Sequence, residues 1–460
     1  MATTVDGLIS GLDTTGIITQ LMQLQAVPQT RLKTSLSSEQ AALSALQSIN
    51  TRFSGLQTAA EKLQQASTWG AAKASSSSAS VTATAASGAL AGSVTFSVTQ
   101  LAAAQSSISG QTFSSLTDTS AITDSSFELH LGSGASAKTV AVNAPADGSL
   151  QSLVNAINGT KDAGVRAAAV QVSPGQYRLQ LTGTSTGAAN TFSLTGTGGA
   201  PLTSVSFSDV TSAQDAVLHV GDPAGGYDIT SASNTIEGVM PGVTLKVTSK
   251  VSDVTINVDT DSDAIASAVQ GLVDAANLAL TGIQNVSSQG VVGSDGKRTG
   301  AGALAGDGLM RQLTSQILSK VTAGVGGQSL STVGIGVNKD GIVTFDKTKF
   351  TAALAADPAG TQAKLTTATT GGTGFADVMQ SFANATGGST GTIAGAITGR
   401  QSTIDDLTDR IADWDVRLAS RKDALQRQYS ALEIALGKLK SQSTWLAGQI
   451  NQMSNTGGSQ

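Results

Sequence analysis

Two histidines are the residues of this sequence that could act as general bases. His130 and His219 are the only imidazoles in the chain, and either could activate a serine nucleophile in a hydrolase. Both lie in segments of alternating apolar and polar residues, "FELHLG" and "AVLHVG", which predict β-strands. No serine is recognisable in the strand-to-helix context of a nucleophile elbow. The pattern therefore favours strand-surface histidines and a protein without catalytic residues.

A short acidic run, "DTDSD" at 259–263, has the alternating carboxylates that open a calcium-binding loop. Ala264 stands where such a loop needs a glycine, and Gln270 replaces its final bidentate glutamate. We interpret the run as a strand end in which Asp261 or Ser262 caps the next helix. The chain has no cysteine, which removes disulfides and typical zinc sites. We expect neither a metal nor a cofactor.

A glycine-rich stretch, "GAGALAGDG" at 300–308, resembles a phosphate-binding loop in composition. No hydrophobic strand precedes it, and no lysine follows at the position that would contact a phosphate. We interpret this stretch as a connection in which Asp307 caps a helix that begins near Leu309.

The composition limits the classes of protein and partner that remain. Of the 460 residues, 13% are charged and 3% are aromatic, so any core must consist of small and aliphatic side chains. The net charge of −5 argues against nucleic acid and against an anionic membrane, which call for a basic surface. We find no apolar run long enough for a spanning helix and no ordinary secretory signal, and we expect a soluble chain. Few charges, many small residues and no cysteine also suit a chain that is exported unfolded.

The N-terminal 70 residues are predicted to be helical. Asp13 is a plausible N-cap, and Pro28 interrupts or restarts the helix at a first-turn position. Farther along, apolar residues follow in alternating steps of three and four, the rhythm of a coiled coil. This N-terminal heptad row comprises Leu46, Ile49, Phe53, Leu56, Ala60 and Leu63. The low-complexity stretch 69–92 then reads as a linker or a polar edge strand.

The middle of the chain is predicted to be rich in β-strands. Residues 93 to about 258 alternate apolar and polar side chains, with one short helix at 149–164. Helices return from about residue 262. A β-hairpin follows around the turn "NKDG", and a short helix ends before Pro358.

The C-terminal segment is predicted to be one long helix. Ser402 and Asp405 form a capping-box sequence, and the helix continues for about 50 residues, or roughly 75 Å. Its C-terminal heptad row comprises Ile404, Ile411, Leu418, Leu425, Leu432, Leu439 and Leu446. A second row contains Leu407 and Trp414 and shifts by one residue to Tyr429, Leu436 and Ile450.

The strict repeat of seven favours a coiled-coil stalk over the alternative, a bundle helix inside one globular domain. We expect Leu418, Leu425, Leu432 and Leu439 to pack on the chain's own N-terminal heptad row. The remaining edge, with Tyr429 and Leu436, would then contact neighbouring subunits or the filament lumen.

Five segments, in order, resemble the bacterial flagellar filament cap proteins, the flagellar hook-associated protein 2 family. The opening "ISGLDTTGIITQLMQLQAVPQTRL" looks like that family's N-terminal signature. Residues 149–187 are similar to a small repeat module that is inserted in flagellins and caps. "NTIEGVMPGVTLKV" with "VDAANLAL", then "LAGDGLMRQL", then "VGIGVNKDGIVTFDKTKFTAALAADP" resemble the family's C-terminal half. Flagellin, the nearest rival, usually opens differently.

The resemblance implies an α+β multidomain fold, with a coiled-coil leg made from both termini, a helical middle domain and β-rich head domains. The leg would comprise 1–42 with 430–460, and the middle domain 43–70 with 260–429. One β-rich head domain would comprise 71–112 with 200–259, and the inserted head module 113–199.

The resemblance also implies a function without catalysis. Cap proteins form a homo-oligomeric ring, usually taken to be about five subunits, at the distal tip of the filament. There they retain exported flagellin and promote its folding and insertion. The implied partners are further copies of the chain, flagellin, the hook–filament junction proteins, the flagellar type III export apparatus and an export chaperone. No nucleic acid or membrane is implied, and the chain would be secreted. An alternative is a surface adhesin whose head binds host glycans.

Overall fold

The structure, a computed structural model, describes residues 13–456 apart from 134–136, 144, 223, 297 and 367–372. The chain divides into two compact units, each described by itself below. The helical unit comprises residues 1–64 with 266–460, and the sheet unit comprises residues 65–265. The predicted α+β multidomain class is confirmed. The predicted leg and most of the predicted middle domain fall within the helical unit, so their division stays a prediction.

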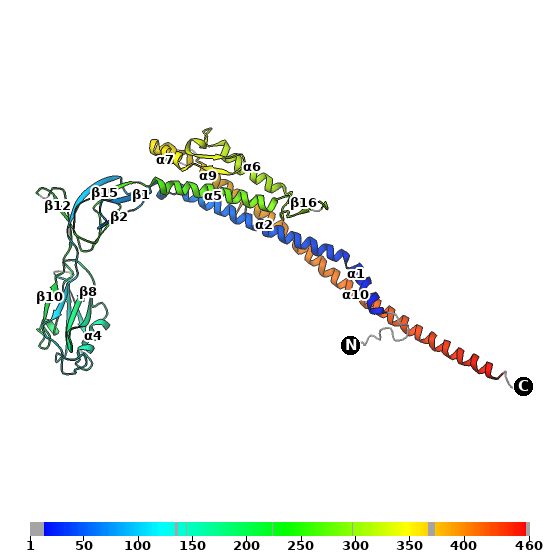
Figure 1. Ribbon diagram of the computed structural model, residues 1–460, viewed down its shortest axis with the longest axis horizontal. Coiled ribbons are helices and arrows are strands. Elements are labelled where there is room, and N and C mark those ends of the chain that lie inside the picture. Colours follow the sequence, from blue (N-terminus) through cyan, green and yellow to red (C-terminus); the bar gives the residue numbers. More distant parts are fainter. Residues whose placement is uncertain are drawn as a thin grey trace. The chain divides into compact units, whose positions relative to one another are not determined.

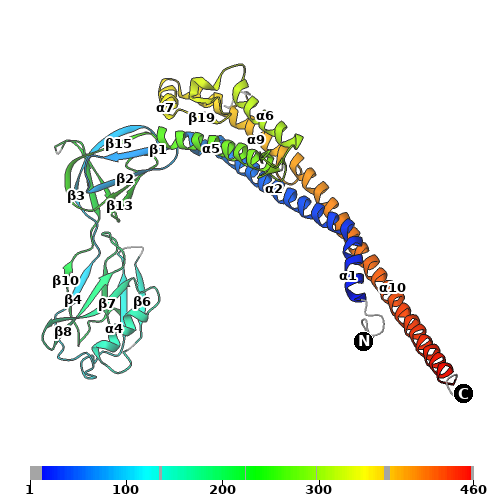
Figure 2. The same ribbon diagram turned by 45° about the vertical axis from the view of Figure 1, so that its right-hand side comes forward.

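Long helices dominate the helical unit. They are α1 (Thr14–Gln25), α2 (Val27–Gln64), α5 (Ser262–Ser287), α6 (Gly308–Ala323), α9 (Phe375–Thr386) and α10 (Thr392–Thr456). The shorter helices are η3 (Leu330–Val333), α7 (Lys347–Ala356) and α8 (Pro358–Leu365). Two hairpins pair β16 (Val291–Val292) with β17 (Arg298–Thr299), and β18 (Ile335–Val337) with β19 (Val343–Phe345). In Figures 1 and 2, α2 and α10 run side by side.

Local signals explain the first two helices. The Asp13 carboxylate accepts a hydrogen bond from the Gly16 N–H at 2.6 Å, which confirms the predicted N-cap. Ala26 separates α1 from α2, and Pro28 lies in the first turn of α2, where its missing N–H costs nothing.

The N-terminal heptad row forms the core of the helical unit. All six of its residues are buried, and Phe53 is 0% exposed. Its ring meets that of Phe382 on α9 edge-on, with the centroids 5.6 Å apart. The row therefore packs on α9 as well as on α10.

Polar contacts show that α2 and α10 are antiparallel. Arg400 Nη1 on α10 donates to Glu39 Oε2 on α2 at 2.7 Å. Farther along α10, Asp415 Oδ1 accepts from Gln29 Nε2 at 2.6 Å. Residue numbers increase along α10 in the direction in which they decrease along α2. These two contacts therefore fix which residues of α2 lie beside each part of α10.

The helix α10 begins earlier than predicted. It starts at Thr392, directly after the glycine-rich turn that ends α9, and runs for 65 residues. Ser402 lies inside the helix, where its hydroxyl donates to Thr398 O at 3.1 Å. The predicted capping box at Ser402 and Asp405 is therefore wrong, because the turn residues 387–391 end α9 and free the chain to begin a helix ten residues sooner.

One helix corrects the expectation that no segment could span a membrane. In the described part of the chain, α5 alone is long and apolar enough by length and composition. Val269, Leu272 and Val273 on this helix are buried in the helical unit. That burial is typical of a core helix, and it explains the apolar composition.

The first core of the sheet unit lies between two antiparallel sheets. The five-stranded sheet has the order β1 (Ala72–Ser76), β15 (Val251–Thr260), β3 (Gly92–Gln100), β11 (Ala216–Val220) and β12 (Tyr227–Ser231). The three-stranded sheet has the order β13 (Thr235–Glu237), β14 (Val243–Val247) and β2 (Val81–Ala85). Alternate residues such as Phe96, Leu218 and Leu245 fill the core between them. β1 is an edge strand, which confirms that interpretation of the stretch 69–92.

The second core lies between two further sheets and a helix. One sheet has the order β10 (Phe207–Thr211), β4 (Ser106–Ser109), β8 (Gln176–Gly183) and β7 (Val165–Ser173). The other has the order β6 (Lys138–Val142), β5 (Phe127–Leu131) and β9 (Phe192–Thr195). The predicted helix is α4 (Leu150–Gly159), capped by Ser149, and its apolar face is buried in this core. Two single-turn helices, α3 (Ala66–Trp69) and η2 (Thr197–Gly199), complete the sheet unit.

This second core is wider than the predicted module 113–199. β4 and β10 lie outside that range, yet β4 pairs with β8 and β10 pairs with β4. Both are short and rich in serine and threonine, so their sequences gave no signal that they join this sheet.

The two cores are nested along the chain. β1 and β15 pair from Ala72 with Thr260 onward, so the chain enters and leaves the sheet unit on neighbouring strands. Within that unit an isolated bridge joins Ala103 to Gln214, just outside β4 and β10. Each inner segment is therefore an insertion whose two ends lie together.

Candidate assembly surface

The residues that could do catalytic chemistry have structural partners. His130 on β5 shares hydrogen bonds with the hydroxyls of Thr195 at 2.9 Å and Thr139 at 3.1 Å, both on neighbouring strands. His219 on β11 lies 2.7 Å from an Asp228 carboxylate oxygen. Both histidines are on strands, as predicted.

The carboxylates singled out in the sequence cap helices. Asp261 accepts from the Ala264 N–H at 2.9 Å at the start of α5, and Asp307 accepts from the Leu309 N–H at 2.8 Å at the start of α6. Across the described residues, no group of three His, Cys, Asp or Glu side chains is placed to hold a metal.

Two Gly-x-Ser-x-Gly sequences occur in the chain, at 183–187 and 387–391. The first follows β8 and leads into a loop, and the second joins α9 to α10. A nucleophile elbow needs a strand before the serine and a helix after it, so neither segment has that context.

The C-terminal heptad row changes its environment along α10. Ile404 and Leu425 are each 8% exposed, whereas Leu432, Leu439 and Leu446 are 45%, 60% and 55% exposed. In the second row Leu407 is buried, Trp414, Tyr429 and Leu436 are half-buried, and Ile450 is exposed. The apolar pattern is thus buried against other parts of the chain near Ile404 and Leu425, and it is exposed from Leu432 onward.

The partners of this row differ from those expected. Glu39 lies beside Arg400, so the N-terminal heptad row faces the beginning of α10 and α9, rather than Leu418 to Leu439. The expected packing of that part of α10 on Leu46, Phe53 and Leu56 is therefore wrong. The antiparallel register places α1 there instead.

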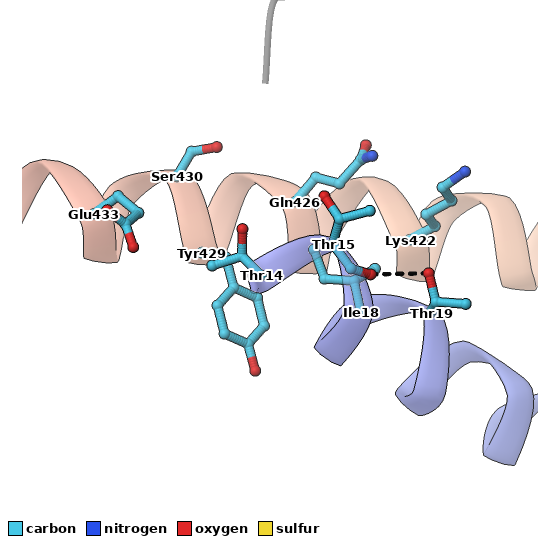
Figure 3. Close-up of a pocket in the computed structure, with 9 residues that line it drawn as sticks. All are labelled: Thr14, Thr15, Ile18, Thr19, Lys422, Gln426, Tyr429, Ser430 and Glu433. Carbon is cyan, nitrogen blue, oxygen red and sulfur yellow. Dashed lines mark hydrogen bonds between the residues drawn. The ribbon is translucent and has the colours of Figure 1, made fainter. Parts of the chain in front are cut away.

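α1 and α10 enclose two shallow grooves. One, of about 380 Å³, lies between Ile18, Met22 and Ala26 of α1 and Leu418 and Ala419 of α10, together with nearby polar residues. The other, of about 180 Å³, adjoins it at Ile18 and reaches Tyr429 and Glu433. Figure 3 shows Tyr429 projecting from α10 past Thr14, at the start of α1. Beyond this point, every residue from Lys438 to Asn451 is exposed with respect to the rest of the described chain.

A second apolar line on α10 was missed by the heptad interpretation. Val416, Ile434 and Trp445 are 68%, 60% and 66% exposed. They are separated by five turns and then three turns of an α-helix, so they share one side, roughly opposite Leu432. A period of 3.6 would have found this line, whereas a period of 3.5 does not return to it.

Gln29 fixes the register between α2 and α10. Its side chain is buried, and Nε2 donates to Asp415 Oδ1 at 2.6 Å and to Ile411 O at 3.4 Å. Hydrogen bonds to charged groups contribute about 1.5–3 kcal/mol. We expect Gln29→Ala to lower the free energy of unfolding of the helical unit by about 1–3 kcal/mol in urea titrations. The matched control is Gln40→Ala at an exposed position of α2, and equal effects of the two changes would contradict a register-fixing role.

Family models match the two ends and the centre of the chain. The model for the flagellar hook-associated protein 2 N-terminus matches residues 10–105, and the model for its C-terminus matches residues 213–441. A flagellin hook IN motif matches residues 127–185, within the second core. The chain belongs to the flagellar hook-associated protein 2 family. The resemblance seen in the sequence is confirmed.

Curated relatives and a solved structure agree with this assignment. The flagellar hook-associated protein 2 of Escherichia coli (strain K12) is 29% identical over 467 residues, which cover 98% of each chain. The lateral flagellar hook-associated protein 2 of Vibrio parahaemolyticus is 32% identical over 286 residues, which cover 60% of this chain and 61% of that one. The crystal structure of the D1-D2-D3 domains of the Escherichia coli flagellar cap protein FliD matches with a TM-score of 0.60 and 28% identity. That match covers 78% of this chain and 99% of the crystallised one.

Membership of this family shows where in the bacterium the protein is found. It is a component of the bacterial flagellum, exported from the cell and found at the distal tip of the filament. Its relatives are structural proteins of the flagellum.

Proposed function

We propose that this chain is a subunit of an oligomeric filament cap that retains exported flagellin and promotes its folding and insertion into the growing filament. The observation that carries the proposal is the C-terminal heptad row, buried at Leu425 and exposed from Leu432 onward. Leaving such a stripe in water forgoes about 1.5–3 kcal/mol per leucine, so its regular continuation favours a partner outside the folded subunit.

The helical unit supplies the leg in this proposal. The buried heptad residues, from Leu46 to Leu63 on α2 and Ile404 and Leu425 on α10, hold together the helices from which the leg extends. The exposed continuation, from Leu432 to Leu446, contacts neighbouring copies or flagellin at the filament tip. The proposed leg pairs 1–42 with 430–460, of which residues 1–12 and 457–460 lie outside the described part of the chain.

Export also belongs to the proposal. A chain without cysteine forms no disulfide before secretion, which suits passage in an unfolded state through the flagellar type III export apparatus. An export chaperone and the hook–filament junction proteins complete the set of proposed partners, and no membrane or nucleic acid is among them.

The proposal is tested by deleting the gene in its own bacterium. Loss of a cap should release unpolymerised flagellin into the medium and leave cells with short filaments or none, and the wild-type chain supplied in trans should restore them. Intact filaments with reduced attachment to glycans would favour the adhesin alternative instead.

A double substitution tests the absence of catalysis. We expect His130→Gln with His219→Gln to leave filament growth unchanged, because both rings lie on strand surfaces with polar neighbours as partners. Filament length and released flagellin are the measurements. A loss of capping by a double variant that is exported and folded normally would show that an imidazole has a role in the activity.

A further inference from the structure

The only ion pair of a histidine at normal hydrogen-bonding distance, within the described residues, lies across the β11–β12 hairpin. His219 and Asp228 are directly opposite each other in the register of the two strands. Nδ1 of His219 lies 2.7 Å from Asp228 Oδ1, and Nε2 lies 3.1 Å from the Asp222 carbonyl oxygen in the following turn. One ring thus joins three points of the hairpin.

Both of these partners are hydrogen-bond acceptors. A carbonyl oxygen cannot donate, and neither can an ionised carboxylate. Each ring nitrogen must therefore carry a proton, which only the imidazolium form provides. A neutral ring has a single N–H, so deprotonation breaks one of the two bonds whichever tautomer forms.

Asp228 and Asp222 are the acidic residues whose charges act on the ring. β3, which pairs with β11 on the other side, has no titratable side chain, and Ser97 is the residue opposite His219. The next acidic residue is Asp253 on β15, whose N–H donates to Ser97 Oγ at 3.1 Å. The Asp228 side-chain hydrogen bond, the bond to the Asp222 carbonyl and the two negative charges raise the pKa of His219 above 6.5, and partial burial opposes them.

The turn is built closely around this ring. The Asp222 carbonyl also accepts from the N–H groups of Gly225 at 3.0 Å and Gly226 at 2.8 Å. A Cβ atom at residue 226 would lie 2.6 Å from His219 Nε2. Only glycine allows the backbone to approach the ring at this distance. The position of the turn is therefore coupled to the ring.

We infer that His219, Asp228 and the Asp222 carbonyl form a proton-dependent clasp that orders the β11–β12 hairpin when the ring is protonated and loosens it when the ring is neutral. Among the described strands β12 pairs only with β11 and is an edge strand, so the hairpin depends on few other contacts. The clasp stabilises the hairpin fully below the unfolded pKa of histidine, about 6.5. Its contribution is lost as the pH rises through the higher folded pKa.

The test uses the full chain with isotope-labelled histidine. Nitrogen chemical shifts across a pH titration give the protonation state of His219, and hydrogen exchange of β12 amides, corrected for intrinsic rates, gives the opening equilibrium of the hairpin. If the hairpin opens locally, linkage requires the opening constant to rise tenfold for each unit by which the folded pKa exceeds the open-state pKa. We expect the opening constant of the hairpin to rise over the same pH range in which the nitrogen shifts show that His219 loses its proton.

Two variants and one internal reference make the outcome decisive. Asp228→Asn should lower the measured pKa of His219 and reduce the pH dependence of β12 exchange. His219→Gln should abolish that dependence, because glutamine does not titrate. His130, whose partners are hydroxyls that can donate or accept, should show no linked opening of β12. A His219 pKa at or below 6.5, or β12 exchange that ignores ring deprotonation, would overturn the clasp.

Discussion

Replacing Leu432 and Leu439 together by aspartate is expected to abolish cap assembly while leaving the isolated subunit folded. Both leucines are about half exposed in the subunit, so their loss removes little burial there. In an assembled leg each would contribute about 1.5–3 kcal/mol, and an unpaired carboxylate in that position costs more. Released flagellin in a complementation assay, sedimentation of the purified protein and its circular dichroism are the measurements.

The matched control is Ala431→Asp with Gln442→Asp. These positions are exposed on the side of the same part of α10 that lies between the heptad row and the second apolar line, and they add the same charge. We expect the control to assemble and to cap filaments. If the leucine variant also does so, the row is only a face of an internal bundle, and the proposed assembly surface is wrong.

The second large effect is expected from Phe53→Ala. Phe53 is fully buried between α2 and α9 and meets Phe382 edge-on, so its truncation leaves a cavity that rigid helices cannot close. Such substitutions cost about 3–5 kcal/mol, a large part of the stability of an ordinary domain. Urea titration followed by helical circular dichroism should show the loss.

Phe53→Leu provides the comparison, because it keeps an apolar side chain and leaves a smaller cavity. We expect it to lie between the wild type and Phe53→Ala. A cost of less than about 1 kcal/mol for Phe53→Ala would mean that the α2–α9 contact is not a core contact.

Periodicity was sufficient to predict the long helices α2 and α10 but not α8 or α9, and polar contacts decided how α2 and α10 pair. The heptad rows on α2 and α10 are visible in the sequence, but one apolar row can pack on another in several registers. The register is fixed by Arg400 with Glu39 and by Gln29 with Asp415, which are separated by hundreds of residues. No local pattern marks these pairs, so the sequence could not tell which leucines α1 covers.

Capping signals were reliable where one residue faced one helix end, as at Asp13, Asp261 and Asp307. Ser402 misled because serine in front of an acidic residue also occurs inside long helices, where the hydroxyl bonds back to the preceding turn. The strands β4 and β10 were misplaced for a different reason. The small polar residues Ser107 and Ser109 of β4 are buried, those of β10 are exposed, and neither strand alternates in hydropathy.

Because the insertions are nested, one segment of the chain can be replaced without altering the segments outside it. Because β1 and β15 are neighbours, the helices on either side of the sheet unit need only two chain ends held close together. The bridge between Ala103 and Gln214 gives the same freedom to the segment inside it. Recombination could therefore replace the inner segment, or the whole sheet unit, with a foreign fold of matching end spacing, while selection on the leg stays undisturbed. The same two junctions are the natural places to graft a reporter or a binding domain onto the filament tip.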